Sequence, residues 1–93
     1  MNNKRFKGGY GIVSNTVLRD PELSLGEKAL YAYLCTYADS KTDELFVSVS
    51  KISDECGIGQ STAKRYIAHL EKKEIIKRVS RGYKVSKITI LLK

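Results

Sequence analysis

The middle of the chain carries two segments with apolar residues at helical spacing, and two glycines separate them. The first segment, residues 48–56, begins at Ser48, a residue type that caps helix N-termini well. Gly57 follows at the position where a helix commonly ends in a left-handed residue. Gly59 then opens the longer segment, residues 60–73. A short helix, a tight glycine turn and a longer helix predict a helix-turn-helix.

The spacing of apolar and polar residues gives each of these predicted helices two faces. The positions expected to lock the helices together are Ile52, Ile58, Ala63 and Ile67, and Tyr66 and Leu70 extend the apolar face of the second helix. The other face of the second helix carries Ser61, Arg65, Ala68 and Lys72, with Lys64 on its flank. Because Ala68 is small, it lets this face approach a partner closely.

Segments on either side complete an α+β domain. Ser24 and Glu27 form a capping box, so a first helix is expected from Ser24 to about Asp39. We expect a short strand at 45–47 and a hairpin with strands at 75–79 and 85–92 around a turn at 80–83. Three helices followed by a C-terminal β-hairpin, the wing, define a winged helix-turn-helix. This domain should cover residues 12–93, after a flexible basic arm at residues 1–11. Within it, residues 13–18 are apolar enough to pack on the domain.

The positive charge of the chain is concentrated in its last third. The whole chain of 93 residues has a net charge of +7. Residues 60–93 hold ten Lys or Arg against two acids and so carry +8, while residues 1–59 carry −1. Charge gathered at one end of a small domain is typical of a surface that meets a polyanion. The asymmetry favours nucleic-acid binding over a basic face that serves solubility alone.

The start of the second predicted helix of the helix-turn-helix is the expected DNA-reading segment. In this docking mode the first residues of that helix reach base edges in the major groove of double-stranded DNA. Arg and Lys side chains bind guanine there, and Gln binds adenine. The exposed N–H groups of the helix start also suit a phosphate. The candidate residues are Gln60, Ser61, Thr62, Lys64 and Arg65.

The tip of the predicted wing supplies a second DNA contact. Gly82 permits the tight turn, and the tip residues expected to contact DNA are Arg81, Tyr83 and Lys84. Such a wing lies along the DNA backbone or enters the minor groove. Along the hairpin, Lys77, Arg78 and Lys87 either add phosphate contacts or are simply solvated strand residues.

Two stretches of the chain, 23–39 and 46–78, resemble the helix-turn-helix domain family of plasmid and phage replication initiators. The similarity lies in the Leu-Ser start and Tyr-Ala close of the first helix, the Phe-x-Ser step from strand to helix, the Gly-Ile turn and the Leu-Glu-x-x-x-Ile-Ile lead into the wing. Two positions depart from the family pattern: Gly59 replaces the usual Ser, and Val47 replaces a frequent Pro. The resemblance implies base reading at Gln60, Ser61, Lys64 and Arg65.

Other functional classes find little support in the sequence. His69 is the one histidine, and Cys35 and Cys56 are well separated, so we expect buried reduced thiols, no metal site and no cofactor. Asp54 and Glu55 are neighbours on a helix and point apart, which leaves no catalytic pair, and we expect no enzyme. Tyr31, Tyr33 and Tyr37 are expected in the core. No apolar run approaches the roughly 20 residues of a membrane helix, and no secretory signal is evident, so a cytoplasmic protein is expected.

Three roles remain open at this point. Sequence-specific DNA binding in replication initiation of a plasmid, phage or mobile element is the leading hypothesis. Transcriptional regulation with the same fold is the first alternative, and a winged-helix protein-interaction module is the second. A single small module buries limited surface on DNA, so we expect a homodimer or several copies on tandem sites, with protein partners of a replication or transcription complex.

Overall fold

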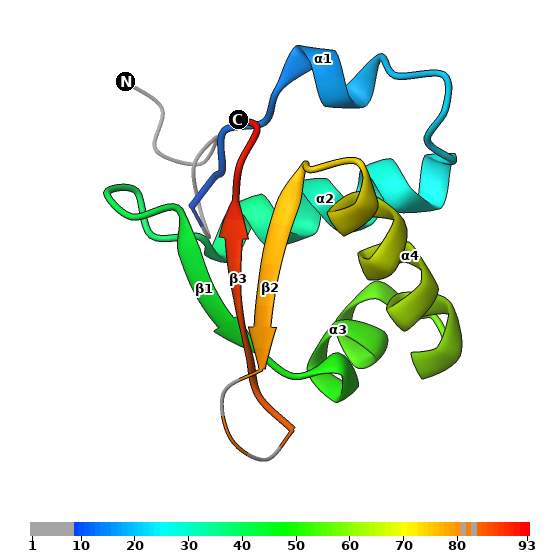
Figure 1. The fold of residues 1–93 in the computed structure, drawn as a ribbon, viewed down its shortest axis with the longest axis vertical. Coiled ribbons are helices and arrows are strands. Elements are labelled where there is room, and N and C mark those ends of the chain that lie inside the picture. Colours follow the sequence, from blue (N-terminus) through cyan, green and yellow to red (C-terminus); the bar gives the residue numbers. More distant parts are fainter. Residues whose placement is uncertain (1–8, 81, 83) are drawn as a thin grey trace.

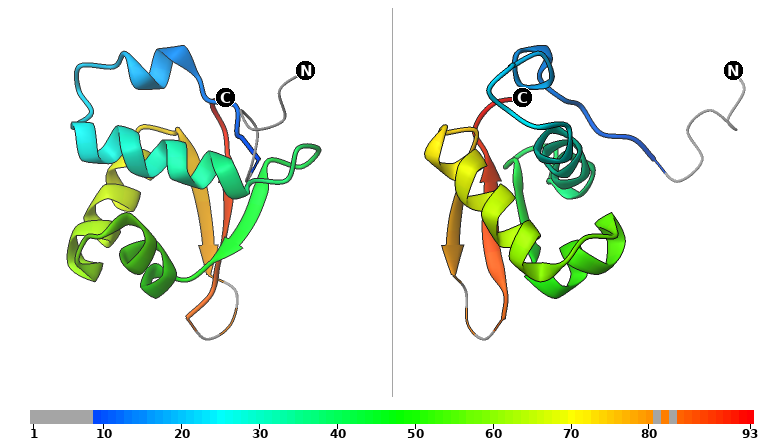
Figure 2. Two further views of the ribbon diagram at one scale, coloured as in Figure 1. Left: turned by 180° about the vertical axis from the view of Figure 1, so that it is seen from behind. Right: turned by 90° about the vertical axis from the view of Figure 1, so that its right-hand side faces the viewer.

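The computed structural model describes residues 9–80, 82 and 84–93, and it forms three antiparallel strands with helices packed on one face (Figures 1 and 2). In chain order the elements are α1 (Asn15–Leu18), α2 (Leu25–Tyr37), β1 (Glu44–Val47), α3 (Val49–Cys56), α4 (Gln60–Lys72), β2 (Ile76–Ser80) and β3 (Ser86–Ile90). This order confirms the predicted α+β winged helix-turn-helix. Most of the arm predicted at 1–11 lies outside the described residues, and its flexibility stays a prediction.

The first predicted helix forms as α2, and its capping box is complete. The Ser24 hydroxyl accepts a hydrogen bond from the Glu27 N–H at 3.1 Å, and the Glu27 carboxylate accepts from the Ser24 N–H at 2.7 Å. The helix ends at Tyr37, slightly before the expected end near Asp39. At that point the Asp39 carboxylate accepts backbone N–H bonds from the following loop and turns the chain toward β1.

The structure contains a fourth helix that the sequence reading did not predict. The short helix α1 is capped by the Ser14 side chain, and its Val17 is buried, which confirms that this segment packs on the domain. The buried Tyr31 hydroxyl accepts from the Ser14 N–H and donates to the Leu92 carbonyl, both at 2.8 Å. Burial raises the pKa of Tyr31 to about 12, so the hydroxyl keeps its proton. One phenol therefore ties both ends of the domain to α2.

The strand order is β1-β3-β2, so the last strand is central. Leu45 and Ile76 pair with Ile88 and Ile90 of β3, respectively, and these four side chains lie on the face toward the helices. None of the described helices lies over the outer face (Figure 2). It carries exposed Phe46 and Val79 together with the charged side chains of the same face. The predicted hairpin is thus the β2–β3 pair, and β1 extends it into a three-stranded sheet.

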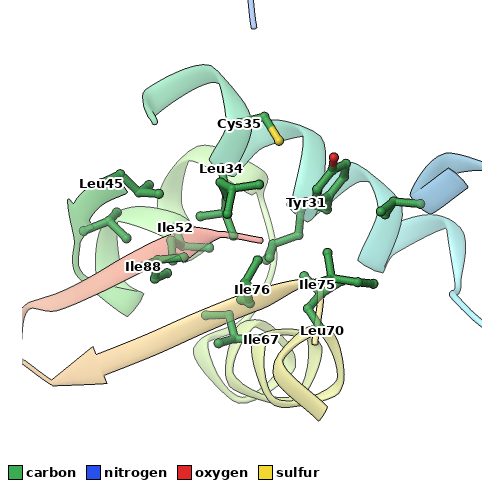
Figure 3. Packing of buried hydrophobic residues seen from close by; sticks show 14 of the residues in the cluster. Tyr31, Leu34, Cys35, Leu45, Ile52, Ile67, Leu70, Ile75, Ile76 and Ile88 are labelled. Atoms are coloured by element: carbon green, nitrogen blue, oxygen red, sulfur yellow. The ribbon is translucent and has the colours of Figure 1, made fainter. Parts of the chain in front are cut away.

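The core lies between the sheet and α2, α3 and α4, as Figure 3 shows. Its largest fully buried side chains include Tyr31, Leu34, Ile52, Leu70, Ile75 and Ile88. Cys35 is buried as predicted, whereas Cys56 is half-buried, and neither forms a disulfide. The core prediction was right for Tyr31 and wrong for Tyr37, which is 45% exposed. Tyr37 lies at the last turn of α2 with its hydroxyl bonded to Glu55 of α3, and Tyr33 is half-buried at the core edge.

A side-chain hydrogen bond joins α2 to α4 at the edge of this core. The second oxygen of the capping-box residue Glu27 lies 2.5 Å from Nδ1 of His69. Burial raises the pKa of Glu27, but the hydrogen bonds from Ser24 and His69 outweigh burial and hold that pKa below its usual value. The sequence indicated no role for His69, but its hydrogen bond to Glu27 fixes α4 against α2.

Replacing Glu27 by Gln should lower the free energy of unfolding at pH 7 by about 1 kcal/mol, because charge-assisted hydrogen bonds become neutral ones. The folded-state pKa of Glu27 is depressed, so its contribution is present above the unfolded value near 4.5 and is lost as the pH falls through the folded value. Urea unfolding at pH 7 and pH 3.5 should show the gap between wild type and E27Q closing in acid. Exposed Glu71→Gln is the control, and parallel pH profiles for E27Q and wild type would contradict the role.

None of the described helices is both long enough and apolar enough to cross a membrane.

Candidate nucleic-acid interface

The angle between α3 and α4 is set by a turn of three residues. Gly57 has φ 68°, in the left-handed region that only glycine enters freely. The Ile58 N–H donates to the Ser53 carbonyl at 3.1 Å, and the Ser53 hydroxyl donates back to the Ile58 carbonyl. Gly59 is then extended and begins α4. The turn predicted from two glycines is confirmed, and Ser53 reinforces it from within α3.

One side of α4 is buried and the opposite side is exposed. Ala63, Ile67 and Leu70 are at most 3% exposed, and the helix packs against α2, α3 and β2. The exposed residues of α4 include Gln60, Ser61, Lys64, Arg65, Ala68 and Lys72, while Thr62 is half-buried. Four of the predicted reading residues therefore share one helix start and one exposed side, and Thr62 lies at its buried margin. Their contact with DNA stays a prediction.

The N-terminus of α4 carries no side-chain cap, because Gly59 has no side chain to accept a bond. By contrast, the Ser48 hydroxyl caps α3 by accepting from the Lys51 N–H at 3.1 Å. The first N–H groups of α4 consequently keep their hydrogen-bonding capacity for an outside acceptor. A bound backbone phosphate would satisfy them.

A groove of about 330 Å³ separates the start of α4 from the hairpin. Its walls come from three places: the start of α3, the start of α4, and the inner side of the hairpin where it leaves the sheet. The polar side chains that line it are Ser48, Ser50, Gln60, Lys64, Arg78, Ser80, Lys84 and Ser86. Figure 1 shows the hairpin extending past α3 on this side of the molecule. Two of the predicted reading residues thus lie on a groove rather than on a flat helix surface.

The structure describes only part of the predicted wing tip. Arg81 and Tyr83 lie outside the described residues. Lys84 is exposed, has φ 63° and borders the groove. Of the strand cations left open by the sequence, Arg78 turns toward the groove, where its Nε donates to the Ser86 hydroxyl at 3.0 Å. Lys77 lies on the opposite, outer face of β2, because successive strand residues alternate.

The acids of the first two thirds of the chain neutralise cations that lie away from the start of α4. Lys73 binds Asp20 at 2.7 Å and Glu22 at 2.6 Å, and Lys93 binds Asp43 at 2.7 Å. On the outer sheet face, Lys87 lies 3.3 Å from Glu44. Within the described part of the chain, Lys64, Arg65 and Arg78 have no acidic partner. Among the cations of the basic last third, the acids thus pair with Lys73, Lys87 and Lys93 and leave the two described cations Lys64 and Arg78 of the groove without an acidic partner.

A cluster of aromatic and charged side chains fixes α3 to the end of α2. The Glu55 carboxylate accepts from the Tyr33 hydroxyl at 2.5 Å and from the Tyr37 hydroxyl at 2.8 Å. Lys51 Nζ lies 4.8 Å above the Tyr37 ring. Glu55 is exposed, as expected of a helix-surface acid. Its hydrogen bonds to the two tyrosines also hold α3, the first helix of the helix-turn-helix, against α2.

The groove itself was missed by reasoning from sequence. Ser48 was interpreted only as a helix cap, and Arg78 was left undecided between phosphate contact and solvation. A signal existed in the strand alternation, which puts Arg78 on the same face as Ile76. That face of the sheet is buried at Ile76, whereas at Arg78 it borders the groove. A charged side chain on the helix-facing side of a strand therefore indicates a solvent-filled groove at that point.

The fold and this basic, exposed helix define a winged helix-turn-helix, a class of DNA-binding domain. Comparison with known families agrees: residues 22–76 match the helix-turn-helix domain family. The match covers more than half of the chain, so the chain belongs to this DNA-binding family. It runs from the loop before α2 to the first residue of β2, so it does not include the rest of the hairpin. No curated protein matches the chain.

The turn should tolerate a side chain at Gly59 and resist one at Gly57. A Cβ meets no atom within 4 Å at either position, so the difference is purely one of backbone conformation. Gly57→Ala should cost about 1–2 kcal/mol of stability, the penalty of a left-handed residue with a Cβ. Gly59→Ser should leave the free energy of unfolding unchanged or raise it by roughly a few tenths of a kcal/mol, because the serine hydroxyl adds an N-cap. Thermal unfolding measures both, and equal effects would contradict this account of the turn.

Arg65→Ala should weaken binding to the preferred duplex by about 1–3 kcal/mol and relax its sequence preference, if Arg65 reads a guanine. Lys72→Ala, two turns along the same exposed side, is the matched control and should weaken preferred and scrambled duplexes about equally. Fluorescence anisotropy with both duplexes measures the difference. A loss from R65A that is the same on both duplexes would show that Arg65 contributes charge alone.

Proposed function

We propose that this chain is a sequence-specific module for double-stranded DNA that acts in replication initiation of a plasmid, phage or mobile element. The observation that carries the DNA-reading part is the start of α4, where Gln60, Lys64 and Arg65 are exposed together and no acid of the described chain pairs with the two cations. These are the side chains that bind purines in the major groove. The proposed role is binding without catalysis.

The replication role rests on the similarity of residues 23–39 and 46–78 to replication initiators. The helix-turn-helix family match is compatible with transcriptional regulation as well. The two roles differ in the arrangement of target sites, since an initiator binds repeated sites at an origin and a regulator binds an operator at a promoter.

The size of the interface indicates that more than one copy acts at a site. A single module of this size buries limited surface on DNA. We propose a homodimer or several copies on tandem sites, assembled in the cytoplasm with protein partners of the replication machinery. Binding to a duplex with one site and to a duplex with two spaced sites distinguishes independent from cooperative copies.

Selection of bound duplexes from a random pool, at two salt concentrations, tests the proposal. A defined sequence should emerge, and log affinity should fall with log salt at a slope of roughly −4 to −6, from about five or six phosphate contacts. Single-stranded DNA of the selected sequence is the control and should bind more weakly. Selected sites repeated at an origin support initiation, whereas a lone promoter operator supports regulation. Failure to retain any duplex, or affinity insensitive to salt, would contradict DNA binding.

A further inference from the structure

The groove between α4 and the hairpin has the chemistry of an anion site. Three cations from three segments border it: Lys64 of α4, Arg78 of β2 and Lys84 of the wing. No Asp or Glu is among the described residues that line it, and the remaining polar groups are hydroxyls and one amide. A groove with one sign of charge and hydroxyl donors favours a phosphate over a neutral or cationic ligand.

Arg78 is held in position before any ligand binds. Its Nε donates to the hydroxyl of Ser86, and Ser86 is only 6% exposed. The two residues lie on neighbouring strands, both on the face toward the helices. The bond to Ser86 uses only Nε, so the terminal guanidinium nitrogens remain to donate to a ligand in the groove. Arginine binds phosphate oxygens through such paired donors.

We propose that this groove holds one phosphodiester of the DNA strand that passes between α4 and the wing, with Arg78 as its pre-positioned donor. Lys64 closes the site from the helix side. The inference rests on the proposed DNA binding and adds a particular backbone contact to it. Since the contact joins helix and hairpin, it sets how far α4 enters the major groove.

A purely structural role for Arg78 is the competing explanation. In that case the bond to Ser86 braces the hairpin, and its loss changes stability without selecting any phosphate. The two roles separate in an experiment that alters the DNA and leaves the protein unchanged. Replacing a single phosphate by a neutral methylphosphonate does this.

The experiment is a methylphosphonate scan across the selected duplex with wild type, Arg78→Ala and Lys77→Ala. Lys77 is the matched control, because it is the adjacent cation of the same strand and lies on the outer face, away from the groove. Wild type and K77A should lose affinity at each contacted phosphate, and at one of them, the phosphate held in the groove, by about tenfold, the value of a charge-assisted bond. R78A should bind more weakly overall and lose less than twofold there. Its salt slope should also be less steep by about 0.9.

Arg78→Gln serves as a second variant if R78A unfolds, and thermal unfolding checks both. If wild type binds the duplex and R78A and R78Q keep the same sensitive position, the groove inference is overturned while DNA binding stands. Equal loss of affinity in R78A and K77A, with unchanged scan profiles, also overturns it. If wild type binds no duplex at all, the proposed function fails together with the inference. A displaced or vanished sensitive position in R78A alone supports the site.

Discussion

The burial of one side of α4 is the constraint on which the rest of this structure depends. Ala63, Ile67 and Leu70 are pressed against α2, α3 and β2, so the helix cannot turn about its own axis without exposing them. One residue of rotation is about 100° in an α-helix, enough to remove Arg65 from the exposed side. The apolar contacts of a 13-residue helix thus decide which of its side chains are exposed.

Polar bonds then hold the elements around α4 at fixed positions. Glu27 joins the start of α2 to His69, and Glu55 joins the end of α2 to α3 through two phenols. Tyr31 fastens both ends of the domain to the same helix. The helix α2 is therefore the element to which the others are bonded, while Lys64 and Arg65 of α4 and Arg78 of β2 have no acidic partner among the described residues.

Most of the local structure could be predicted because its causes are local. The capping box at Ser24, the left-handed Gly57 and the change of period after Glu74 each act within a few residues, and each prediction is confirmed. The errors concern distant partners. The start of α1 is bonded to the Tyr31 hydroxyl, and the exposed Tyr37 bonds to Glu55 of α3. Such contacts have no signature in the nearby sequence.

The sequence by itself determined the helix-turn-helix, the position of the basic helix start and the overall excess of positive charge, because periodicity, caps and composition are properties of short stretches. Only the tertiary structure decided which cations remain unpaired. Folding brings Asp20, Glu22 and Asp43 against Lys73 and Lys93, and it turns Arg78 inward beside Lys64. These pairings join residues far apart along the chain, and Coulomb attraction acts on distance in space rather than on order in sequence.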